Sequence, residues 1–384
     1  MTQSQKARID SAVTTAIASG ATPGAALVVG RGERVVFEGY YGFLAKGEPP
    51  VTRDTVYDLS SLTKPLATLA CVLRIAAANR LSLSAPLHTI LPEFTGDDRD
   101  ARRGDVTLRD ALAHCAGLPA RKLYFDALAE IERRDGVSLV GTEEGSRWIL
   151  TQALTELLVD APGRVVTYSD VGYIVLGGWL ERVTGLTLDR VFSEQIAAPL
   201  SLGVTGFMRK RSGCSARKPV DIGHVAPTDR CAWRGRVIRG EVQDENAYAM
   251  GGVAGHAGLF SSAVEVHRLV AAFVRSFESH GGLFDHALVR QCWAGAGSVV
   301  DGSTWSLGWD TPTPGGSSAG EKVSSRAFGH LGFTGTSIWV DLDRGVHVVL
   351  LTNRVHPDKE NLAIREMRPR VHDAVFETVD RDGW

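Results

Sequence analysis

The amino-acid sequence predicts an α/β (α+β) protein in which an antiparallel sheet, flanked by helices, carries an all-α insertion. Short β-branched runs, which are typical of strands, occur near the N-terminus and again near the C-terminus. The long middle of the chain, residues 81–202, contains helical patterns and no strand-rich stretch. Strands at both ends with helices between them indicate one sheet built from both termini. We therefore expect a sheet domain from residues 1–75 and 225–384, and a mostly helical insertion from residues 76–224.

The N-terminal part is expected to contain one helix, one hairpin and a second, buried helix. Apolar residues recur at helical spacing over residues 3–19, and Gly20 follows as a stop signal. Two β-branched runs, residues 24–30 and 34–39, flank a short turn. An alanine-rich helical stretch begins at Leu62, and its apolar run from Pro65 to Ala78 is interrupted by Arg74. It is too short for the ~20 apolar residues that span a bilayer, which predicts a buried helix.

The rest of the chain continues this division into helices and a terminal hairpin. Helical patterns cover residues 108–113, 123–132, 147–158 and 171–183. Residues 203–258 are rich in Gly, Pro and Arg and have little periodicity, which predicts long loops around a site. Strand patterns at residues 336–341 and 346–353 predict a second hairpin, and a helix over residues 362–379 closes the chain.

The composition is that of an ordinary globular protein. Of 384 residues, 44% are hydrophobic and 22% charged, which excludes extended disorder. The formal net charge of −2 gives no overall attraction for polyanions, so we expect neither nucleic acid nor a membrane as partner. The first ten residues lack the apolar segment of a secretory signal, so we expect a cytoplasmic protein. The five cysteines form no Cys-x-x-Cys pair, which predicts reduced, mostly buried thiols and no zinc site.

The first candidate for chemistry is Ser61-Leu-Thr-Lys64, at the start of the alanine-rich helix. Residues three apart share a helix face, so the Lys64 amine is expected beside the Ser61 hydroxyl. The amine can take the serine proton if burial and neighbouring charge keep it neutral. Pro65 fits only the first helical turn, so the helix should begin near Ser61, where backbone N–H groups can bind an oxyanion. The alternative is a helix cap followed by a solvated lysine.

Two other serine patterns are expected to be accidental. Ser215-Ala-Arg-Lys218 repeats the serine–lysine spacing, but no apolar helix follows it. Gly316-Ser-Ser-Ala-Gly320, with Ser318 at its centre, matches the nucleophile elbow of α/β-hydrolases. That elbow requires a buried strand before the serine and a helix after it, and the sequence contains neither. We expect a flexible loop there.

Two further motifs are weak when each is taken alone. Tyr168-Ser-Asp170 precedes a helix, and a phenol beside a serine–lysine pair can pass protons. The alternative is a helix N-cap at Ser169 or Asp170. Residues 329–336 are glycine-rich and lead into a strand, where a backbone N–H can supply an oxyanion donor and His330 would face the site. The alternative is a turn with an incidental histidine.

A basic stretch in the predicted loops has two explanations. It could be a solvated loop face, or a rim that attracts an anionic substrate such as a carboxylate. Its members are Arg209, Lys210, Arg211, Arg217, Lys218, Arg230, Arg234, Arg236 and Arg239.

Taken together and in this order, Ser61-x-x-Lys64, Tyr168-x-Asp170 and His330-x-Gly332 resemble the penicillin-recognising serine hydrolases over almost the whole chain. The most similar members are class C β-lactamases, family VIII carboxylesterases and D-aminopeptidases. Residues 107–119, 244–260 and 352–357 also resemble segments of β-lactamase-related hydrolases.

This resemblance implies the β-lactamase/penicillin-binding-protein-like fold and acyl transfer through a serine ester. It implies that Ser61 is the nucleophile, Lys64 its base and Tyr168 a proton relay. The N–H groups of Ser61 and Phe333 would form the oxyanion hole, and Asp170, His330 and Gly332 would bind substrate. If Thr334-Gly335 fills the family's Lys-Thr-Gly pattern instead, the donor moves to Thr336.

Two departures from the family pattern guide the expected function. A class C β-lactamase has lysine where His330 stands and asparagine where Asp170 stands. A neutral histidine binds a carboxylate poorly near pH 7, and an aspartate adds negative charge, so both changes disfavour anionic β-lactams.

We therefore expect a serine esterase for small carboxylic esters, with weak or no β-lactamase activity. The alternatives are a D-amino-acid amidase or peptidase, an acyltransferase, and an inactive binding protein. The expected partner is a small-molecule ester or amide. No metal or organic cofactor is implied, and the oligomeric state is unknown.

Overall fold

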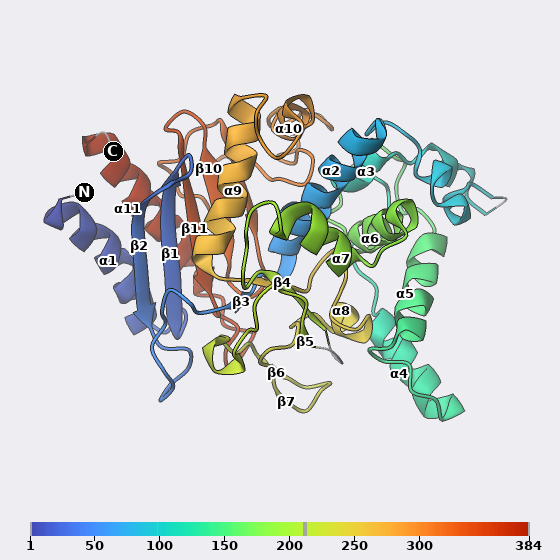
Figure 1. The fold of residues 1–384 in the computed structure, drawn as a ribbon, viewed down its shortest axis with the longest axis horizontal. Helices are drawn as coiled ribbons and strands as arrows, with labels where there is room; N and C mark the ends of the chain where they lie inside the picture. Colours follow the sequence, from blue (N-terminus) through green and yellow to red (C-terminus); the bar gives the residue numbers. More distant parts are fainter. Residues whose placement is uncertain (1, 98, 210–212, 383–384) are drawn as a thin grey trace.

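A five-stranded antiparallel sheet forms one side of the molecule in the computed structural model, which describes residues 2–97, 99–209 and 213–382 (Figure 1). Its strand order is β2 (Arg34–Gly42), β1 (Gly24–Arg31), β11 (Val346–Thr352), β10 (Ser337–Asp341) and β9 (Ala327–Leu331). Leu27 pairs with Leu350, so the N-terminal hairpin lies directly beside the C-terminal strands. The predicted α/β fold, with a sheet built from both termini, is confirmed.

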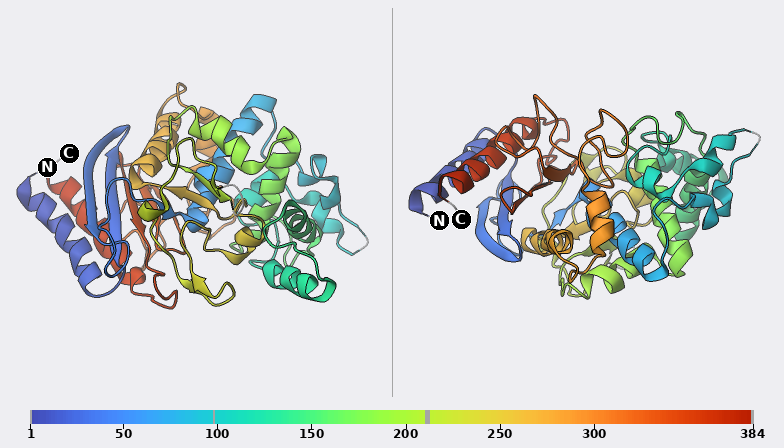
Figure 2. Two further views of the ribbon diagram at one scale, coloured as in Figure 1. Left: turned by 60° about the horizontal axis from the view of Figure 1, so that its bottom comes forward. Right: turned by 90° about the horizontal axis from the view of Figure 1, so that it is seen from above.

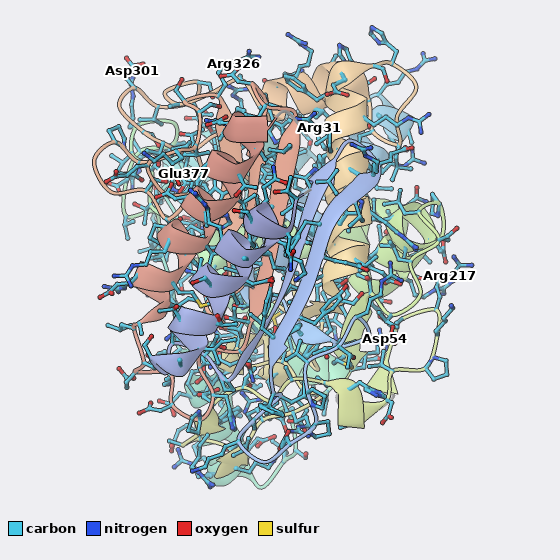
Figure 3. All side chains as sticks on the ribbon, turned by 90° about the vertical axis from the view of Figure 1, so that its left-hand side faces the viewer. Arg31, Asp54, Arg217, Asp301, Arg326 and Glu377 are labelled. Carbon is cyan, nitrogen blue, oxygen red and sulfur yellow. The ribbon has the colours of Figure 1, made fainter. Side chains whose placement is uncertain are left out.

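Both faces of this sheet are covered by helices. Successive residues of a strand point to opposite faces. Ala26 and Val28 therefore belong to the core under α9 (Ala263–Glu278), and Leu27 and Val29 to the core under α1 (Gln3–Ala18) and α11 (Ile364–Asp382). Figure 3 shows α1 and α11 lying side by side across their face of the sheet. Because both faces are buried, β1 is an unbroken apolar run.

The helices of the middle part lie beyond α9, at the opposite end of the molecule from the termini (Figure 2). They are α2 (Ala70–Asn79), α3 (Leu108–Leu112), α4 (Tyr124–Asp135), α5 (Glu143–Thr155), α6 (Asp170–Thr184) and α7 (Leu188–Phe192). Helix α5 begins four residues before the prediction, because Thr142 caps it by accepting a hydrogen bond from the Gly145 N–H at 3.0 Å. The spacing of apolar residues cannot reveal a polar first turn of this kind.

The prediction of loops over residues 203–258 was wrong in part. This region contains β4 (Gly206–Arg209), β5 (Gly213–Cys214), β6 (Arg230–Cys231), β7 (Arg236–Val237) and α8 (Glu245–Ala249). Strand β4 pairs with β8 (Leu259–Ser261), which pairs with β3 (Tyr57–Asp58) in a second small sheet. These strands are two to four residues long, too short to show a strand pattern. The helices α9 and α10 (His286–Cys292) were not predicted. The boundaries of the two expected domains stay a prediction.

The predicted buried helix crosses the centre of the molecule. It begins with a 3₁₀ turn over Ser60–Leu62 and a π-helical turn over Lys64–Leu69, and continues as α2. By length and composition alone, Ser60–Asn79 could cross a membrane, but 78% of its most apolar window is buried inside the protein. It therefore packs as a core helix.

Four cysteines, Cys71, Cys115, Cys231 and Cys292, are buried and free, as predicted. The side chain of Cys214 lies outside the described part of the structure.

Candidate active site

The turn that carries Ser61 is held from below by a buried aspartate. Asp58, at the end of β3, accepts hydrogen bonds from the Ser60 N–H at 2.8 Å and from the Gln243 N–H at 2.6 Å. Ser60 has a φ of 49°, in the left-handed region that a non-glycine residue rarely adopts. The next residue, Ser61, lines a cavity of 590 Å³.

Lys64 lies one turn further on and is completely buried. Its Nζ is 3.1 Å from Ser61 Oγ, 2.7 Å from Asp170 Oδ1 and 3.4 Å from the carbonyl oxygen of His256. The predicted contact between serine and lysine is therefore present. The alternative of a solvated lysine is wrong.

The charge of Lys64 differs from the neutral amine that the sequence analysis required. Burial by itself would lower the pKa of Lys64, but the carboxylate of Asp170 and the phenol of Tyr168 outweigh it and raise the pKa above its ordinary value. The resting site therefore holds an ammonium–carboxylate pair. Asp170 lines the cavity, as expected of a substrate-binding residue, but one of its oxygens is already bound to Lys64.

Tyr168 lies over this pair. The Lys64 Nζ is 4.6 Å from the centre of the Tyr168 ring, so the aromatic side chain lies against the serine–lysine pair. Burial raises the pKa of Tyr168, although the charge of Lys64 opposes the change. The next residue, Ser169, is the N-cap of α6, with its Oγ accepting from the Gly172 N–H at 3.0 Å. The N-cap and the phenol are therefore neighbours in one motif, not alternatives.

A histidine that the sequence analysis missed holds this motif. The carbonyl of His114 accepts from the Thr167 N–H at 2.8 Å, and its Nδ1 accepts from the Ser169 N–H at 3.0 Å. The His114 ring packs 4.4 Å from the Tyr168 ring. His114 thus fixes the backbone on both sides of the phenol. Its position five residues before Pro119, in a segment noted for its resemblance, was the available signal.

The end of β9 forms the opposite wall of the cavity, where His330, Leu331, Gly332 and Phe333 line it. Burial, together with the nearby charge of Lys64, lowers the pKa of His330 to about 3. Its imidazole is therefore neutral, and the Nδ1 lies 2.9 Å from the Leu331 carbonyl oxygen. At Gly332, a Cβ would come within 2.7 Å of the Leu59 carbonyl oxygen, so only glycine fits there.

The Phe333 N–H points toward the nucleophile turn. It donates to the Oγ of Ser60 at 3.1 Å. In the alternative register, Thr336 would supply the oxyanion donor. Thr334 and Thr336 are instead buried, and their hydroxyls donate to the carbonyls of Asp58 and Leu59. A substrate oxygen that reaches the Phe333 N–H must therefore displace Ser60 Oγ.

The comparisons with known proteins agree with this geometry. The chain matches the family described as Beta-lactamase over residues 9–369. It belongs to the beta-lactamase family. It is 30% identical over 374 residues to an N-acetylmuramyl-L-alanine amidase of Bacillus subtilis (strain 168), covering 91% of this chain and 81% of that protein. It is 31% identical over 332 residues to a putative D-alanyl-D-alanine carboxypeptidase of Escherichia coli (strain K12), covering 80% and 72% of the two chains.

Among solved structures, the fold is similar to that of EstCE1, a hydrolase with promiscuous acyltransferase activity. The TM-score is 0.74 at 24% identity, and the match covers 97% of this chain and 99% of the other. Family and fold together identify this member of the beta-lactamase family as a serine hydrolase.

Most of the arginines that line the cavity of this beta-lactamase-family protein are bonded to other groups of the protein. Arg354 donates to the Phe333 carbonyl at 2.9 Å, and Arg368 donates to the Gly332 and Thr336 carbonyls at 2.7 and 2.8 Å. Arg121 pairs with Glu245 at 2.9 Å. Most cations near Ser61 therefore support the walls and are not free for a substrate.

The basic stretch predicted as a possible anionic rim does not line this cavity in the described part of the chain. Arg209 pairs with Asp189 at 2.7 Å and Arg236 with Glu241 at 2.8 Å, while Arg239 pairs with Glu48. Lys210 and Arg211 lie outside the described residues. The solvated, internally paired loop is the better explanation.

The two accidental serine patterns also lie away from the cavity. Ser215 Oγ accepts from the Phe207 N–H at 2.9 Å, and Lys218 is exposed in a loop. Ser318 lies in a turn without the strand and helix of a nucleophile elbow.

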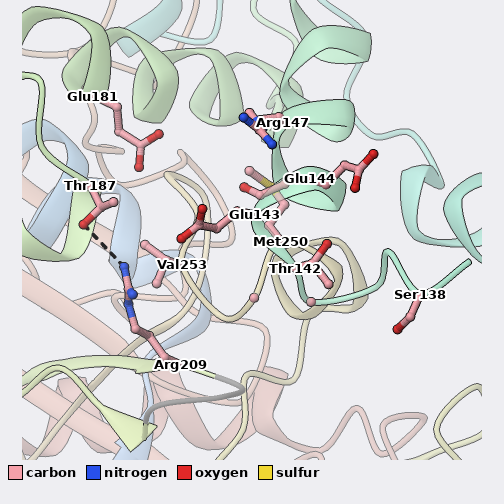
Figure 4. Close-up of a pocket in the computed structure, with 13 residues that line it drawn as sticks. Ser138, Thr142, Glu143, Glu144, Arg147, Glu181, Thr187, Arg209, Met250 and Val253 are labelled. Carbon is pink, nitrogen blue, oxygen red and sulfur yellow. Dashed lines mark hydrogen bonds between the residues drawn. The ribbon is translucent and has the colours of Figure 1, made fainter.

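A second cavity of 760 Å³ lies between α5, α6 and β4 (Figure 4). Glu143, Glu181 and Arg209 project into it, and Arg209 also bonds to Thr187. Its lining, within the described residues, combines no serine with a lysine or histidine. The cavity at Ser61 is therefore the candidate active site.

Proposed function

We propose that this protein is a serine esterase that cleaves small, uncharged carboxylic esters through an acyl-enzyme on Ser61. The observation that carries the proposal is the 3.1 Å contact between Ser61 Oγ and the fully buried Nζ of Lys64, beside the Tyr168 phenol, in an open cavity. A hydroxyl within hydrogen-bonding reach of a base is the arrangement that activates a nucleophile.

The first step requires that Lys64 lose its extra proton. The ammonium paired with Asp170 has no lone pair, so the reactive form is the neutral amine, with its extra proton released to water and Asp170 left ionised. Ser61 Oγ then attacks the ester carbon while its proton moves to Lys64. The Ser61 and Phe333 N–H groups stabilise the oxyanion once the substrate oxygen replaces Ser60 Oγ.

Collapse of this intermediate needs a proton on the leaving alcohol. The Tyr168 side chain, whose ring centre lies 4.6 Å from Lys64 Nζ, is placed to pass the proton from Lys64 to the alcohol oxygen. Water then attacks the acyl-enzyme by the reverse route. An alcohol in place of water would give acyl transfer by the same steps.

Charge and surface favour an uncharged substrate. His330 is neutral and Asp170 is negative, so the two family positions nearest the substrate offer a carboxylate no cation. Trp305, Leu331 and the 47%-exposed Phe333 supply apolar surface in the cavity. These features support esters with an apolar group over anionic β-lactams.

A second candidate is an amidase for substrates with a free amine. Asp244, Glu245 and Asp310 also line the cavity, and carboxylates attract an ammonium group. The relatives named as an amidase and a putative D-alanyl-D-alanine carboxypeptidase support this class of bond. The same acyl-enzyme on Ser61 would serve it.

Labelling with a fluorophosphonate probe tests the proposal directly. We expect a single covalent adduct in the intact mass, mapped to the peptide that contains Ser61, and no adduct in Ser61→Ala. Ser318→Ala and Ser215→Ala serve as matched controls and should label like the wild type. A label on Ser318, or no label, would overturn the proposal.

Turnover then separates the two substrate classes. We expect p-nitrophenyl butyrate to be hydrolysed far faster than D-alanyl p-nitroanilide or nitrocefin. If D-alanyl amides exceed esters by orders of magnitude, the amidase replaces the esterase.

A further inference from the structure

Residues 255–259 lie along the turn that carries Ser61 and Lys64 and are hydrogen-bonded to it. Thr68 Oγ1 donates to the Gly255 carbonyl at 2.6 Å, and the Leu259 N–H donates to Thr63 Oγ1 at 3.1 Å. Between these fixed points, the His256 carbonyl accepts from Lys64 Nζ at 3.4 Å. Three polar side chains of the helix start thus bind the backbone of one short segment.

The imidazole of His256 ties this segment to a second element. The ring is 1% exposed, and its Nε2 lies 2.9 Å from Oδ1 of Asp244. Asp244 is the N-cap of α8, accepts from the Ala247 N–H at 2.8 Å and faces Arg121 at 3.6 Å. Burial would raise the pKa of Asp244, but His256 and Arg121 outweigh it and lower the pKa. The carboxylate therefore stays charged and holds the ring.

The partners of Lys64 determine where its lone pair points. An ammonium has three N–H groups, and a neutral amine has two N–H groups and one lone pair. The ionised Asp170 and the His256 carbonyl can only accept hydrogen bonds. In the neutral amine, both N–H groups are therefore taken by these two acceptors, and the lone pair faces the third neighbour, Ser61 Oγ.

We propose that His256, held by Asp244, is a positioning residue whose carbonyl aims the lone pair of Lys64 at the Ser61 hydroxyl. In the step it supports, the O–H bond of Ser61 breaks and its electron pair stays on Oγ. The proton forms a new N–H bond on the lone pair of Lys64, and Oγ bonds to the substrate carbon. This role rests on the proposed acyl-enzyme chemistry.

The activity profile against pH reports on this arrangement. The titratable groups that face Lys64 are Asp170 and Tyr168 at the start of α6, Tyr173 within α6, and His114 and His330. A looser His256 carbonyl removes one acceptor from the ammonium and so makes the neutral amine easier to form. The acid limb of the profile should then move to lower pH, while the plateau falls because the lone pair is less well aimed.

The first test compares His256→Ala with the wild type in p-nitrophenyl butyrate hydrolysis, with rates expressed per active site titrated by fluorophosphonate. We expect kcat on the plateau to fall about 10- to 100-fold, the cost of a misplaced reacting group, with little change in KM. His256→Gln should recover most of the rate, because its amide N–H can reach Asp244. His267→Ala removes another buried histidine, which contacts His347 at 2.7 Å and does not line the cavity at Ser61, and it should change neither plateau nor limb.

Asp244→Ser keeps the proposal testable if His256→Ala does not fold. Serine still caps α8 but is too short to reach His256, so its plateau and limb should change as in His256→Ala. The double variant should lose little more than either single one, because both break the same contact. An unchanged plateau in either single variant, or a His256→Gln as impaired as His256→Ala, would overturn the inference.

The two proposals fail in different ways. If the wild type does not label on Ser61, the proposed function itself fails. If Ser61 labels normally and the His256 and Asp244 variants keep the plateau and acid limb of the wild type, only the positioning role fails.

Discussion

The two walls that face Ser61 each carry a buried basic group, and the two groups have opposite charge states. On the helical wall, Lys64 is fully buried and remains an ammonium, because Asp170 lies 2.7 Å away. On the strand wall, His330 is 2% exposed and neutral, because burial and the charge of Lys64 lower its pKa. Burial opposes the charged form of both groups.

The difference between the walls is therefore set by the counter-ion. A carboxylate beside Lys64 compensates its desolvation, whereas His330 has only the Leu331 carbonyl at its Nδ1. The helical wall is built to move a proton, and the strand wall to present neutral surface.

Removing the charged group from the helical wall should have the largest effect. Lys64→Met keeps the bulk of the side chain but has no base, and we expect kcat to fall by about 10²–10⁴-fold, the usual contribution of a general base. The measurement is p-nitrophenyl butyrate turnover, with circular dichroism as the control for folding. A variant within tenfold of the wild type would mean that another group takes the Ser61 proton.

Removing only the counter-ion of Lys64 should shift the pH dependence of the activity. Asp170→Asn leaves the ammonium without a negative neighbour, so the neutral amine exists at lower pH than in the wild type. The acid limb of kcat/KM should move down by about one to three pH units, the usual effect of one opposite charge. The profile from pH 5 to 11 checks this, and an unmoved limb would show that Lys64 is not the titrating base.

Placing a cation on the strand wall should change the substrate preference. With His330→Lys, a substrate carboxylate would find an ammonium beside Ser61. A hydrogen bond to a charged group is worth about 1.5–3 kcal/mol, so kcat/KM for nitrocefin should rise about tenfold or more relative to p-nitrophenyl butyrate. The ratio of the two substrates is the readout, since it cancels any general loss of activity caused by the substitution. An unchanged ratio would mean that His330 does not meet the substrate.

The smallest effect is expected where the two walls touch, at Ser60 and Phe333. Ser60→Ala and Ser60→Gly both remove the hydroxyl that occupies the Phe333 N–H, but only glycine relieves the φ of 49°. Ser60→Gly should therefore be more stable than Ser60→Ala by about 1 kcal/mol, the cost of a left-handed conformation with a Cβ. Urea unfolding of the two variants checks the difference, and equal midpoints would contradict it.

The parts of the site that the sequence predicted are local or come from the family resemblance. The contact between Ser61 and Lys64 follows from helical spacing. The nearness of Tyr168 and His330 rested on their order in the resemblance, because no local pattern links them to Ser61. Contacts over 106 residues, from Lys64 to Asp170, and over 192 residues, from Lys64 to His256, are fixed only by the folded chain. The contact with Asp170 raises the pKa of Lys64, whose amine the sequence analysis had expected to be neutral.

The fold, too, contains elements that could be predicted from the sequence and elements that could not. The terminal hairpins were predictable because β1 and β11 are rich in apolar and β-branched residues. The segment of β9 was open to two interpretations, a glycine-rich strand backbone beside the site or a turn, because Gly329 weakens the strand pattern; pairing with β10 makes it a strand. Helix α9 was not predicted, although its sequence contains a Ser262 N-cap before an amphipathic run, a pattern that indicates a helix. The two-residue strands β3 and β5 had no sequence signal of their own.

Strand β1 pairs with β11, which follows it in the chain only after all the helices of the middle part. On the ribosome, the hairpin of β1 and β2 must therefore keep one edge unpaired until β11 has emerged. The same closure brings the start and the finish of the chain together, where Arg8 on α1 meets Glu377 on α11 at 2.9 Å. A circularly permuted gene that joins these ends and opens the chain at an exposed loop would let both hairpins emerge in succession.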